Sequence, residues 1–274
     1  MRNLTTPDFY AKIHHMETTD KIKNIAARLK YVGTNYHGWQ VQKEHKSIAG
    51  TLEGALTKLC GHKVQVSGCG RTDAGVHAEN YCFNFKTTSK IPVERFPLAI
   101  NTILPPDISV QNTIIAPDDF DANLSCIKKQ YTYKIYNSRI RDPFYSNRAY
   151  FYPQKLNLDV MRKAANFFVG THDFAAVRSV GTETKTTIRT VYWYEIEEKG
   201  DLIELHVCAN GFLYNMARAM AGTLIYVSEG KILPDELPRL LEKKDRKLTG
   251  PTVPPQGLYL SKIWYNAPVS KMFT

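Results

Sequence analysis

Two successive runs of strands and helices constrain the fold of this 274-residue chain more than any other feature. Hydrophobic periodicity and turn residues predict strand, helix, strand, strand, helix, strand over residues 25–31, 47–61, 63–67, 81–85, 92–103 and 108–115. The same order recurs over residues 131–135, 157–170, 187–197, 202–209, 213–228 and 258–265, with a short extra helix over 235–243. No sequence repeat accompanies it, so element order alone predicts an α/β (α+β) fold of two tandem β-α-β-β-α-β units, of the ferredoxin-like or RNA-recognition type.

The remaining residues divide the chain into an extension and two halves. Residues 1–22 are polar and aperiodic, which predicts a poorly ordered N-terminal extension. Residues 23–122 are expected to form the N-terminal half, and residues 123–274 the C-terminal half that completes a cleft. The second half carries a segment, 139–156, that is rich in Arg, Tyr and Phe and reads as a loop. Loops mounted on a rigid sheet commonly make ligand contacts.

The stretch Gly68-Cys-Gly-Arg-Thr-Asp-Ala-Gly-Val-His-Ala78 is the candidate for chemistry. Its three glycines let the backbone turn sharply and let a substrate approach closely. Arg71 and Asp73 are two residues apart, so their side chains project the same way if this loop is extended. A guanidinium can then keep a carboxylate ionised and aimed, as a nucleophile or a general base. Composition alone allows the alternative of a glycine-rich turn with a surface ion pair.

Charge and cysteine usage limit the class of protein. A net charge of +10 indicates an anionic partner, most simply nucleic acid, with an unspecialised basic surface as the alternative. The five cysteines are scattered and form no CxxC pair, which argues against a disulfide framework or a zinc site and suits a reducing compartment. No apolar run approaches the length of a membrane span, and the start lacks the layout of a signal peptide. We therefore expect a cytoplasmic protein without membrane or metal.

The loop Gly70-Arg-Thr-Asp-Ala-Gly-Val-His-Ala78 resembles the catalytic signature of the tRNA pseudouridine synthase A family. Six further stretches resemble landmarks of that family, in the family's order and over most of the chain. They are Tyr36-His-Gly-Trp-Gln40, Asp119-Phe-Asp-Ala122, Tyr131-Thr-Tyr133, Asp173-Phe174, Asn210-Gly-Phe-Leu-Tyr-Asn-Met216 and Gly257-Leu-Tyr-Leu260.

This resemblance implies a pseudouridine synthase fold, in which a mostly antiparallel central sheet is flanked by helices. It also implies a homodimer whose basic cleft binds tRNA. The implied reaction is isomerisation of uridine to pseudouridine at positions 38, 39 and 40 of the tRNA anticodon stem-loop. The base is detached from its ribose at N1, turned and rejoined through C5, so the reaction requires no cofactor.

The resemblance also assigns roles to individual residues. Asp73 matches the catalytic aspartate, and attack on the sugar, addition to the base and removal of a ribose proton all stay open for it. Arg71 would orient Asp73, and Arg218 matches a second arginine that pairs with the aspartate from the other half. Tyr131 matches a tyrosine that stacks on the base and can accept a proton, although an isolated strand tyrosine is more often a core residue. Leu260 matches an apolar wall of the base pocket.

A uridine in a stem must be flipped out to react, at a cost of a few kcal/mol. Contacts between basic side chains and phosphates would supply that energy. The candidates are Lys128, Lys129, Arg178 and Arg189, together with Arg139, Arg141 and Arg148 of the loop. A strand arginine such as Arg189 is more often simply solvated, and His77 is expected to pack the glycine-rich loop rather than transfer protons. Gln130 departs from the family pattern, because a basic residue is usual there.

Two other functions are compatible with parts of this pattern. A catalytically silent RNA-binding protein of the same fold would account for the charge and the aromatic strands, but it does not need the Arg71 and Asp73 pair. A glycoside hydrolase also breaks a glycosidic bond, but it would require a second acidic residue, and none lies near Asp73 in the sequence.

Overall fold

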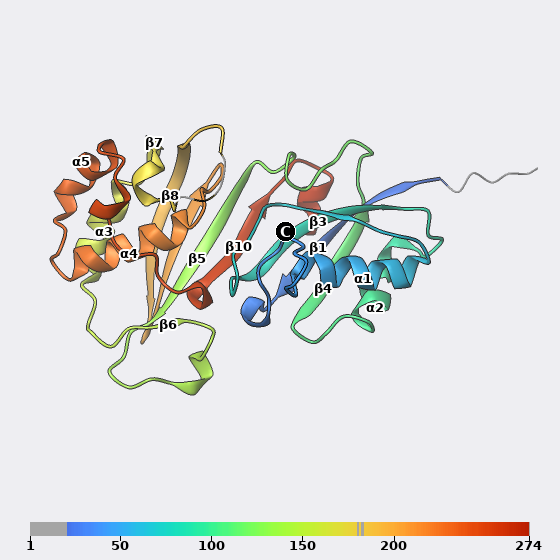
Figure 1. Ribbon diagram of the computed structural model, residues 1–274, viewed down its shortest axis with the longest axis horizontal. Coiled ribbons are helices and arrows are strands. Elements are labelled where there is room, and N and C mark those ends of the chain that lie inside the picture. Colours follow the sequence, from blue (N-terminus) through green and yellow to red (C-terminus); the bar gives the residue numbers. More distant parts are fainter. Residues whose placement is uncertain (1–20, 180, 182–183, 274) are drawn as a thin grey trace, which may run out of the picture.

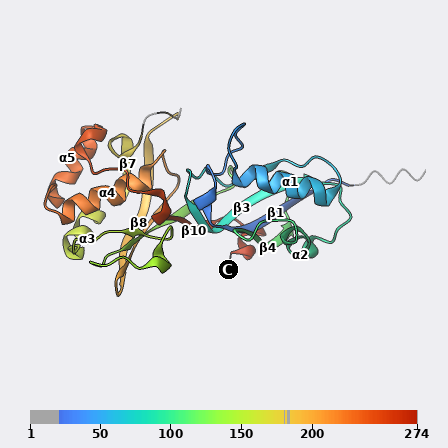
Figure 2. The ribbon, with the colours of Figure 1, turned by 60° about the horizontal axis from the view of Figure 1, so that its bottom comes forward.

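The computed structural model describes residues 21–179, 181 and 184–273, so residues 1–20 of the expected extension lie outside the described residues. A ten-stranded sheet passes through both halves of the molecule. Helices α1 (Ile48–Cys60) and α2 (Phe96–Asn101) lie beside its first half, and α3 (Leu158–Asn166), α4 (Met216–Ser228) and α5 (Leu237–Glu242) gather at the other end (Figure 1). Figure 2 gives the same arrangement after a turn of 60°. The expected fold class is confirmed.

The first half is one β-α-β-β-α-β unit. Its strands are β1 (Lys23–Tyr31), β2 (Val66–Gly68), β3 (His77–Thr87) and β4 (Ile108–Ile115). They lie in the order β4-β1-β3-β2, and each strand is antiparallel to its neighbours. Helix α1 connects β1 to β2, and α2 connects β3 to β4. The glycine-rich loop is thereby the connection between two paired strands, which fixes both of its ends.

The second half repeats that topology. Its strands are β5 (Lys128–Tyr136), β8 (Ile188–Lys199), β9 (Leu202–Ala209) and β10 (Leu258–Trp264), in the order β10-β5-β9-β8. Strand β10 is antiparallel to β5 and parallel to β3, so the last strand of the chain joins the two halves. Two short strands were not expected, β6 (Tyr150–Phe151) beside β5 and β7 (Gly170–Asp173) beside β8. The division at residues 122 and 123 stays a prediction.

Local signals set the helix ends. Ser47 Oγ accepts the N–H of Gly50 at 3.2 Å, and helix α1 ends at Gly61 with a φ of 73°, as expected for a serine N-cap and a left-handed glycine cap. Helix α4 was expected to begin at residue 213 but begins at Met216. The reason is that Asn215 has a left-handed backbone (φ 60°, ψ 7°), which a right-handed helix cannot include. Residues 210–215 therefore form a separate loop.

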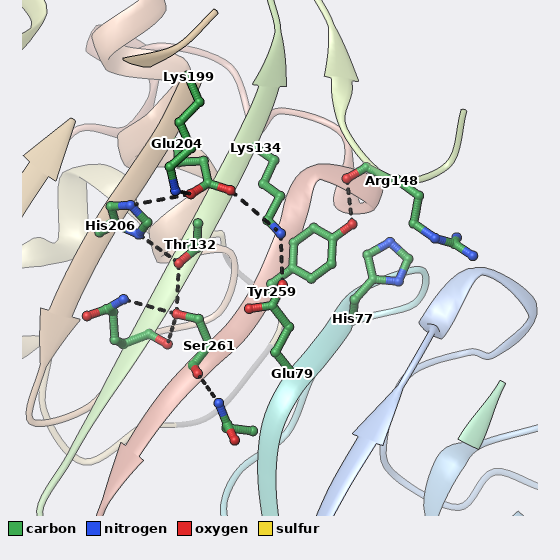
Figure 3. Close-up of polar contacts among 12 residues, drawn as sticks. His77, Glu79, Thr132, Lys134, Arg148, Lys199, Glu204, His206, Tyr259 and Ser261 are labelled. Atoms are coloured by element: carbon green, nitrogen blue, oxygen red, sulfur yellow. Dashed lines mark hydrogen bonds and ion pairs between the residues drawn. The ribbon is translucent and has the colours of Figure 1, made fainter. Parts of the chain in front are cut away.

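A polar network crosses the junction between the halves (Figure 3). The ammonium of Lys134 on β5 donates to Glu79 of β3 at 2.8 Å and lies 3.7 Å from Glu204 of β9. The hydroxyl of Thr132 donates to Ser261 of β10 at 2.8 Å. These contacts tie three strands of the second half to β3, so they help to fix the two halves relative to each other.

His77 is a buried part of the same junction. Its ring centroid lies 4.7 Å from that of Tyr259. Nδ1 accepts the N–H of Gly33 at 3.0 Å, so Nε2 carries the ring proton and donates to the carbonyl of Gln256 at 3.2 Å. Burial lowers the pKa of His77 from 6.5 to about 4. A neutral, doubly hydrogen-bonded ring agrees with the packing role expected for this residue.

We expect the free energy of unfolding to fall as the pH decreases from 6.5 towards about 4, because the unfolded chain then binds a proton at His77 that the folded protein does not. At ~1.4 kcal/mol per pKa unit, this contribution reaches ~3 kcal/mol. Urea unfolding of the parent and of His77→Gln across this pH range measures it. The parent should lose more stability on acidification than the variant, and equal losses would contradict the assignment.

Candidate active site

A cleft of about 1410 Å³ lies between the halves, and both contribute to its walls. The glycine-rich loop lines one side, and β5 and the loop 210–215 line the other. The charged side chains that line it are Arg71, Asp73, Asp121, Lys129, Arg178 and Arg189. With four cations against two carboxylates, the cleft has the sign of charge that an RNA backbone requires.

The backbone of the glycine-rich loop is held by its neighbours. The N–H of Trp39 donates to the carbonyl of Thr72 at 3.1 Å, and the hydroxyls of Tyr31 and Thr72 are hydrogen-bonded at 2.9 Å. Gly38 has a φ of 80°, and a Cβ atom there would lie 2.2 Å from the carbonyl oxygen of Thr72. Only glycine allows this close approach, which fixes the position of Thr72 and hence of Asp73 after it.

Asp73 lies in the cleft with its side chain 28% exposed. Its Oδ2 is 3.5 Å from Nη1 of Arg218, which comes from helix α4 of the other half. Burial raises the pKa of Asp73, and the guanidinium of Arg218 offsets part of that rise. The structure thus brings together two of the predicted site residues, 145 positions apart in the sequence.

The expected contact between Arg71 and Asp73 is not formed. Arg71 is exposed at the cleft and has no hydrogen bond or ion pair with any residue that the structure describes. The loop turns Asp73 towards α4, while the guanidinium of Arg71 remains in solvent. Arg218, which the resemblance also predicted to pair with Asp73, is the arginine that contacts this carboxylate.

Arg218 is itself held firmly. Its Nε donates to the carbonyl of Val253 at 2.7 Å, and Nη1 donates to Oδ1 of Asn215 at 2.8 Å. The side chain is 14% exposed, so few positions are open to it. Sequence reasoning missed both acceptors. Asn215 lies in a stretch that resembles the family, but no sequence pattern indicates its left-handed backbone.

Tyr131 faces the cleft from β5 and is 8% exposed. Its ring packs edge-on against Phe212, with 4.9 Å between the ring centroids. Burial raises the pKa of the Tyr131 phenol, and the negative charge of Asp73 raises it further. The hydroxyl has no hydrogen-bond partner among the described residues. This buried, neutral phenol presents an aromatic surface beside the carboxylate.

The leucine of β10 that lines the cleft lies two positions before the expected one. Leu260 is opposite Tyr131 in the β10–β5 register, but it is 1% exposed and does not line the cleft. Leu258, two residues earlier and on the same face of β10, lines it instead. Leu258, Phe212 and Tyr131 are thus the apolar and aromatic side chains from β10, the loop 210–215 and β5 that line this cleft.

Three of the seven expected RNA contacts line the cleft, namely Lys129, Arg178 and Arg189, whereas Lys128, Arg139, Arg141 and Arg148 are not in its lining. The ammonium of Lys129 donates to the carbonyl of Cys69, so this lysine also supports the glycine-rich loop. Arg189 donates to the carbonyl of Ile188 at 2.7 Å, and burial lowers its pKa. Arg178 lines the cleft and makes no side-chain hydrogen bond with a described residue.

Lys128 is not brought to the cleft. Consecutive strand residues point to opposite faces of a sheet, so Lys128 faces away from the side that Lys129 occupies. Its ammonium lies 4.7 Å and 4.9 Å from the ring centroids of Trp193 and Trp264, at distances typical of cation–π contacts.

One group of side chains of the metal-ligating type lies close together in the described part of the chain. It consists of Glu197, Glu204 and His206, whose ligand atoms are within 4.8 Å of one another. Lys199 donates to Glu197 at 3.0 Å and to Glu204 at 2.7 Å, so one ammonium already forms ion pairs with both carboxylates.

None of the described helices is long and apolar enough to cross a membrane.

Comparisons with known proteins identify the family of this chain. A family model described as tRNA pseudouridine synthase matches residues 26–123 and 164–266. The tRNA pseudouridine synthase A of Caldicellulosiruptor bescii is 47% identical over 244 residues, which cover 89% of this chain and 100% of that protein. The tRNA pseudouridine synthase A of Thermoanaerobacter sp. (strain X514) is 45% identical with the same coverage. A solved structure titled "Crystal Structure of a Cbf5-Nop10-Gar1 Complex" has a TM-score of 0.31 and 12% identity, over 74% of this chain and 54% of that chain, which is too weak a likeness to carry an argument. On the strength of the family model and the two relatives, this chain belongs to the tRNA pseudouridine synthase family.

Proposed function

We propose that this protein isomerises uridine to pseudouridine at positions 38, 39 and 40 of the tRNA anticodon stem-loop, with Asp73 as the catalytic carboxylate. Membership of the family supports the isomerase activity. The observation that carries the role of Asp73 is its environment, a partly exposed carboxylate paired with Arg218 and opposite a buried aromatic ring in a basic cleft.

We infer a part in the reaction for each of these side chains, and the geometry of the cleft supports it. A flipped uracil would lie against the ring of Tyr131, with Phe212 and Leu258 as further apolar walls. The raised pKa of Tyr131 keeps its phenol protonated at neutral pH, which supports stacking over proton acceptance. Asp73 would act as a nucleophile or a base while the N1 bond breaks and the C5 bond forms. Every one of these actions requires the ionised carboxylate, which Arg218 favours.

The test is tritium release from C5-labelled uridine in tRNA transcripts that carry a single labelled position. We expect release from positions 38, 39 and 40 and none from labelled positions elsewhere in the tRNA. Binding of the transcripts without release would instead identify a catalytically silent RNA-binding protein. The homodimer and the cytoplasmic location rest on the resemblance and the composition, and sedimentation equilibrium of the purified protein tests the dimer.

Binding of tRNA is expected to weaken steeply with salt, because each phosphate contact releases counterions. Replacing Arg71 or Arg178 with Gln should lower the slope of log Kd against log salt by about 1 each, since both guanidinium groups line the cleft. Lys128→Gln is the matched control, because Lys128 lies outside the cleft lining. Filter binding at several salt concentrations measures the slopes. A slope unchanged by Arg71→Gln and Arg178→Gln, or lowered by Lys128→Gln, would contradict this assignment.

A further inference from the structure

The distance between the Arg218 guanidinium and the Asp73 carboxylate is longer than is usual for such an ion pair. Charge-assisted hydrogen bonds between a guanidinium and a carboxylate are usually ~2.7–2.9 Å long. Here Nη1 of Arg218 is 3.5 Å from Oδ2 of Asp73, whereas two neutral acceptors are closer, Asn215 Oδ1 at 2.8 Å and Val253 O at 2.7 Å. A weaker class of acceptor thus holds the guanidinium, and the stronger acceptor is kept at a distance.

The orientation of the Asn215 amide is set by Arg218. An arginine can only donate, so the amide atom that faces Nη1 must be the oxygen. The amide nitrogen then donates to the hydroxyl of Ser179 at 3.0 Å. The N–H of Ser179 in turn donates to the carbonyl of Tyr214 at 3.1 Å. Turning the amide over would break the bond to Arg218, so Asn215 presents its oxygen to the guanidinium.

We propose that Asn215 is a positioning residue that restrains the Arg218 guanidinium from closing onto Asp73, so that the carboxylate remains available to the uridine. The inference rests on the proposed role of Asp73. Without the amide, Nη1 loses its nearest acceptor while Nε stays tethered to Val253. The side chain is 14% exposed, so little solvent replaces the amide and Asp73 becomes the acceptor within reach. A closed ion pair would leave the carboxylate less free to react.

Among the described residues, few groups besides Arg218 affect the pKa of Asp73. Arg218 is the charged group that contacts it, and Tyr131 is the titratable group opposite, with a neutral phenol. Arg71 is exposed, so solvent screens its charge. A change in the titration of Asp73 therefore reports mainly on the distance to Arg218.

Two substitutions of Asn215 should move that titration in opposite directions. Asn215→Gly keeps the left-handed backbone and removes the amide, so Arg218 should close onto Asp73 and lower its pKa. Asn215→Asp supplies a competing carboxylate, which should draw the guanidinium away and raise the pKa of Asp73. The fall in Asn215→Gly is the discriminating result, because a new carboxylate raises the pKa of Asp73 by its charge alone, whereas loss of a residue that merely supports the fold would not lower it.

The experiment combines kinetics with carbon-13 NMR of the aspartate carboxyl groups. The signal of Asp73 is assigned as the one that is missing from the spectrum of Asp73→Asn. For Asn215→Gly we expect kcat to fall about tenfold with KM for tRNA within about twofold, together with the lower pKa. Ser179→Ala, which frees the amide to rotate, should give a smaller change in the same direction. Asn147→Gly is the control, because Asn147 is another asparagine with a positive φ (56°) and lies outside the cleft lining.

An unshifted Asp73 titration in Asn215→Gly and Ser179→Ala, or a shift of the same sign in Asn215→Gly and Asn215→Asp, overturns the inference. So does an effect of Asn147→Gly equal to that of Asn215→Gly. The proposed function fails separately, if the parent releases no tritium or if Asp73→Asn remains active. The NMR titration still reports on the ion pair in that case, so the two failures are distinguishable.

Discussion

Asp73→Asn is expected to lower the rate of tritium release by on the order of 10³-fold or more, while the Kd for tRNA stays within a few-fold. The amide has the size of the carboxylate but cannot ionise, so it can neither attack nor take a proton. Arg218 would remain anchored by Val253 and Asn215, which preserves the shape of the cleft. Single-turnover release and filter binding measure the two quantities.

Asp121→Asn is the matched control for this prediction. Asp121 is the other carboxylate in the cleft lining, but it accepts hydrogen bonds from the hydroxyl of Ser67 and from the backbone of Asn123 and Leu124. The rate of tritium release by Asp121→Asn should remain within a few-fold of that of the parent. An active Asp73→Asn variant, or an equal loss in Asp121→Asn, would remove Asp73 from its assigned role.

Gly222→Ala is expected to destabilise the protein by ~1–3 kcal/mol, although a single methyl group is added. A Cβ at Gly222 of helix α4 would lie 1.9 Å from the carbonyl oxygen of Pro251, which is a backbone atom and cannot rotate away. The displaced segment leads to Val253, whose carbonyl anchors Arg218. We therefore expect a lower rate of isomerisation as well as a lower free energy of unfolding, measured with urea.

Gly54→Ala provides the control for that change. Gly54 is an exposed residue of helix α1, and a Cβ there meets nothing within 4 Å. Alanine favours a helix over glycine by ~0.5–1 kcal/mol, so this variant should be more stable than the parent. A Gly222→Ala variant as stable as the parent would show that the segment after residue 250 moves without cost.

Local signals predicted much of the fold, because the serine cap, the glycine cap and the hydrophobic period act within a few residues. The caps at Ser47 and Gly61 lie where the sequence predicted them, and so does the order of the main elements. The four-residue strand β7 was missed, since so short a run shows no clear alternation.

The resemblance predicted the members of the site and one of its contacts. Asp73, Tyr131 and Arg218 were named from it, and the structure brings them together and pairs Arg218 with Asp73. The contact between Arg71 and Asp73 was expected because the two residues are close in sequence, but the guanidinium that contacts Asp73 comes from helix α4. Tertiary partners of this kind depend on how α4 packs, which no local pattern encodes.

Strand β10 occupies the middle of the sheet but follows the other described strands along the chain. During synthesis, the edges of β3 and β5 that β10 covers stay unpaired until residues 258–264 leave the ribosome, and unpaired edges favour association with other chains. The cleft cannot assemble before that moment, since among the described strands β10 is the one that pairs with both halves. A chain terminated before residue 258 would thus lack an active centre even though Asp73, Tyr131 and Arg218 are all present.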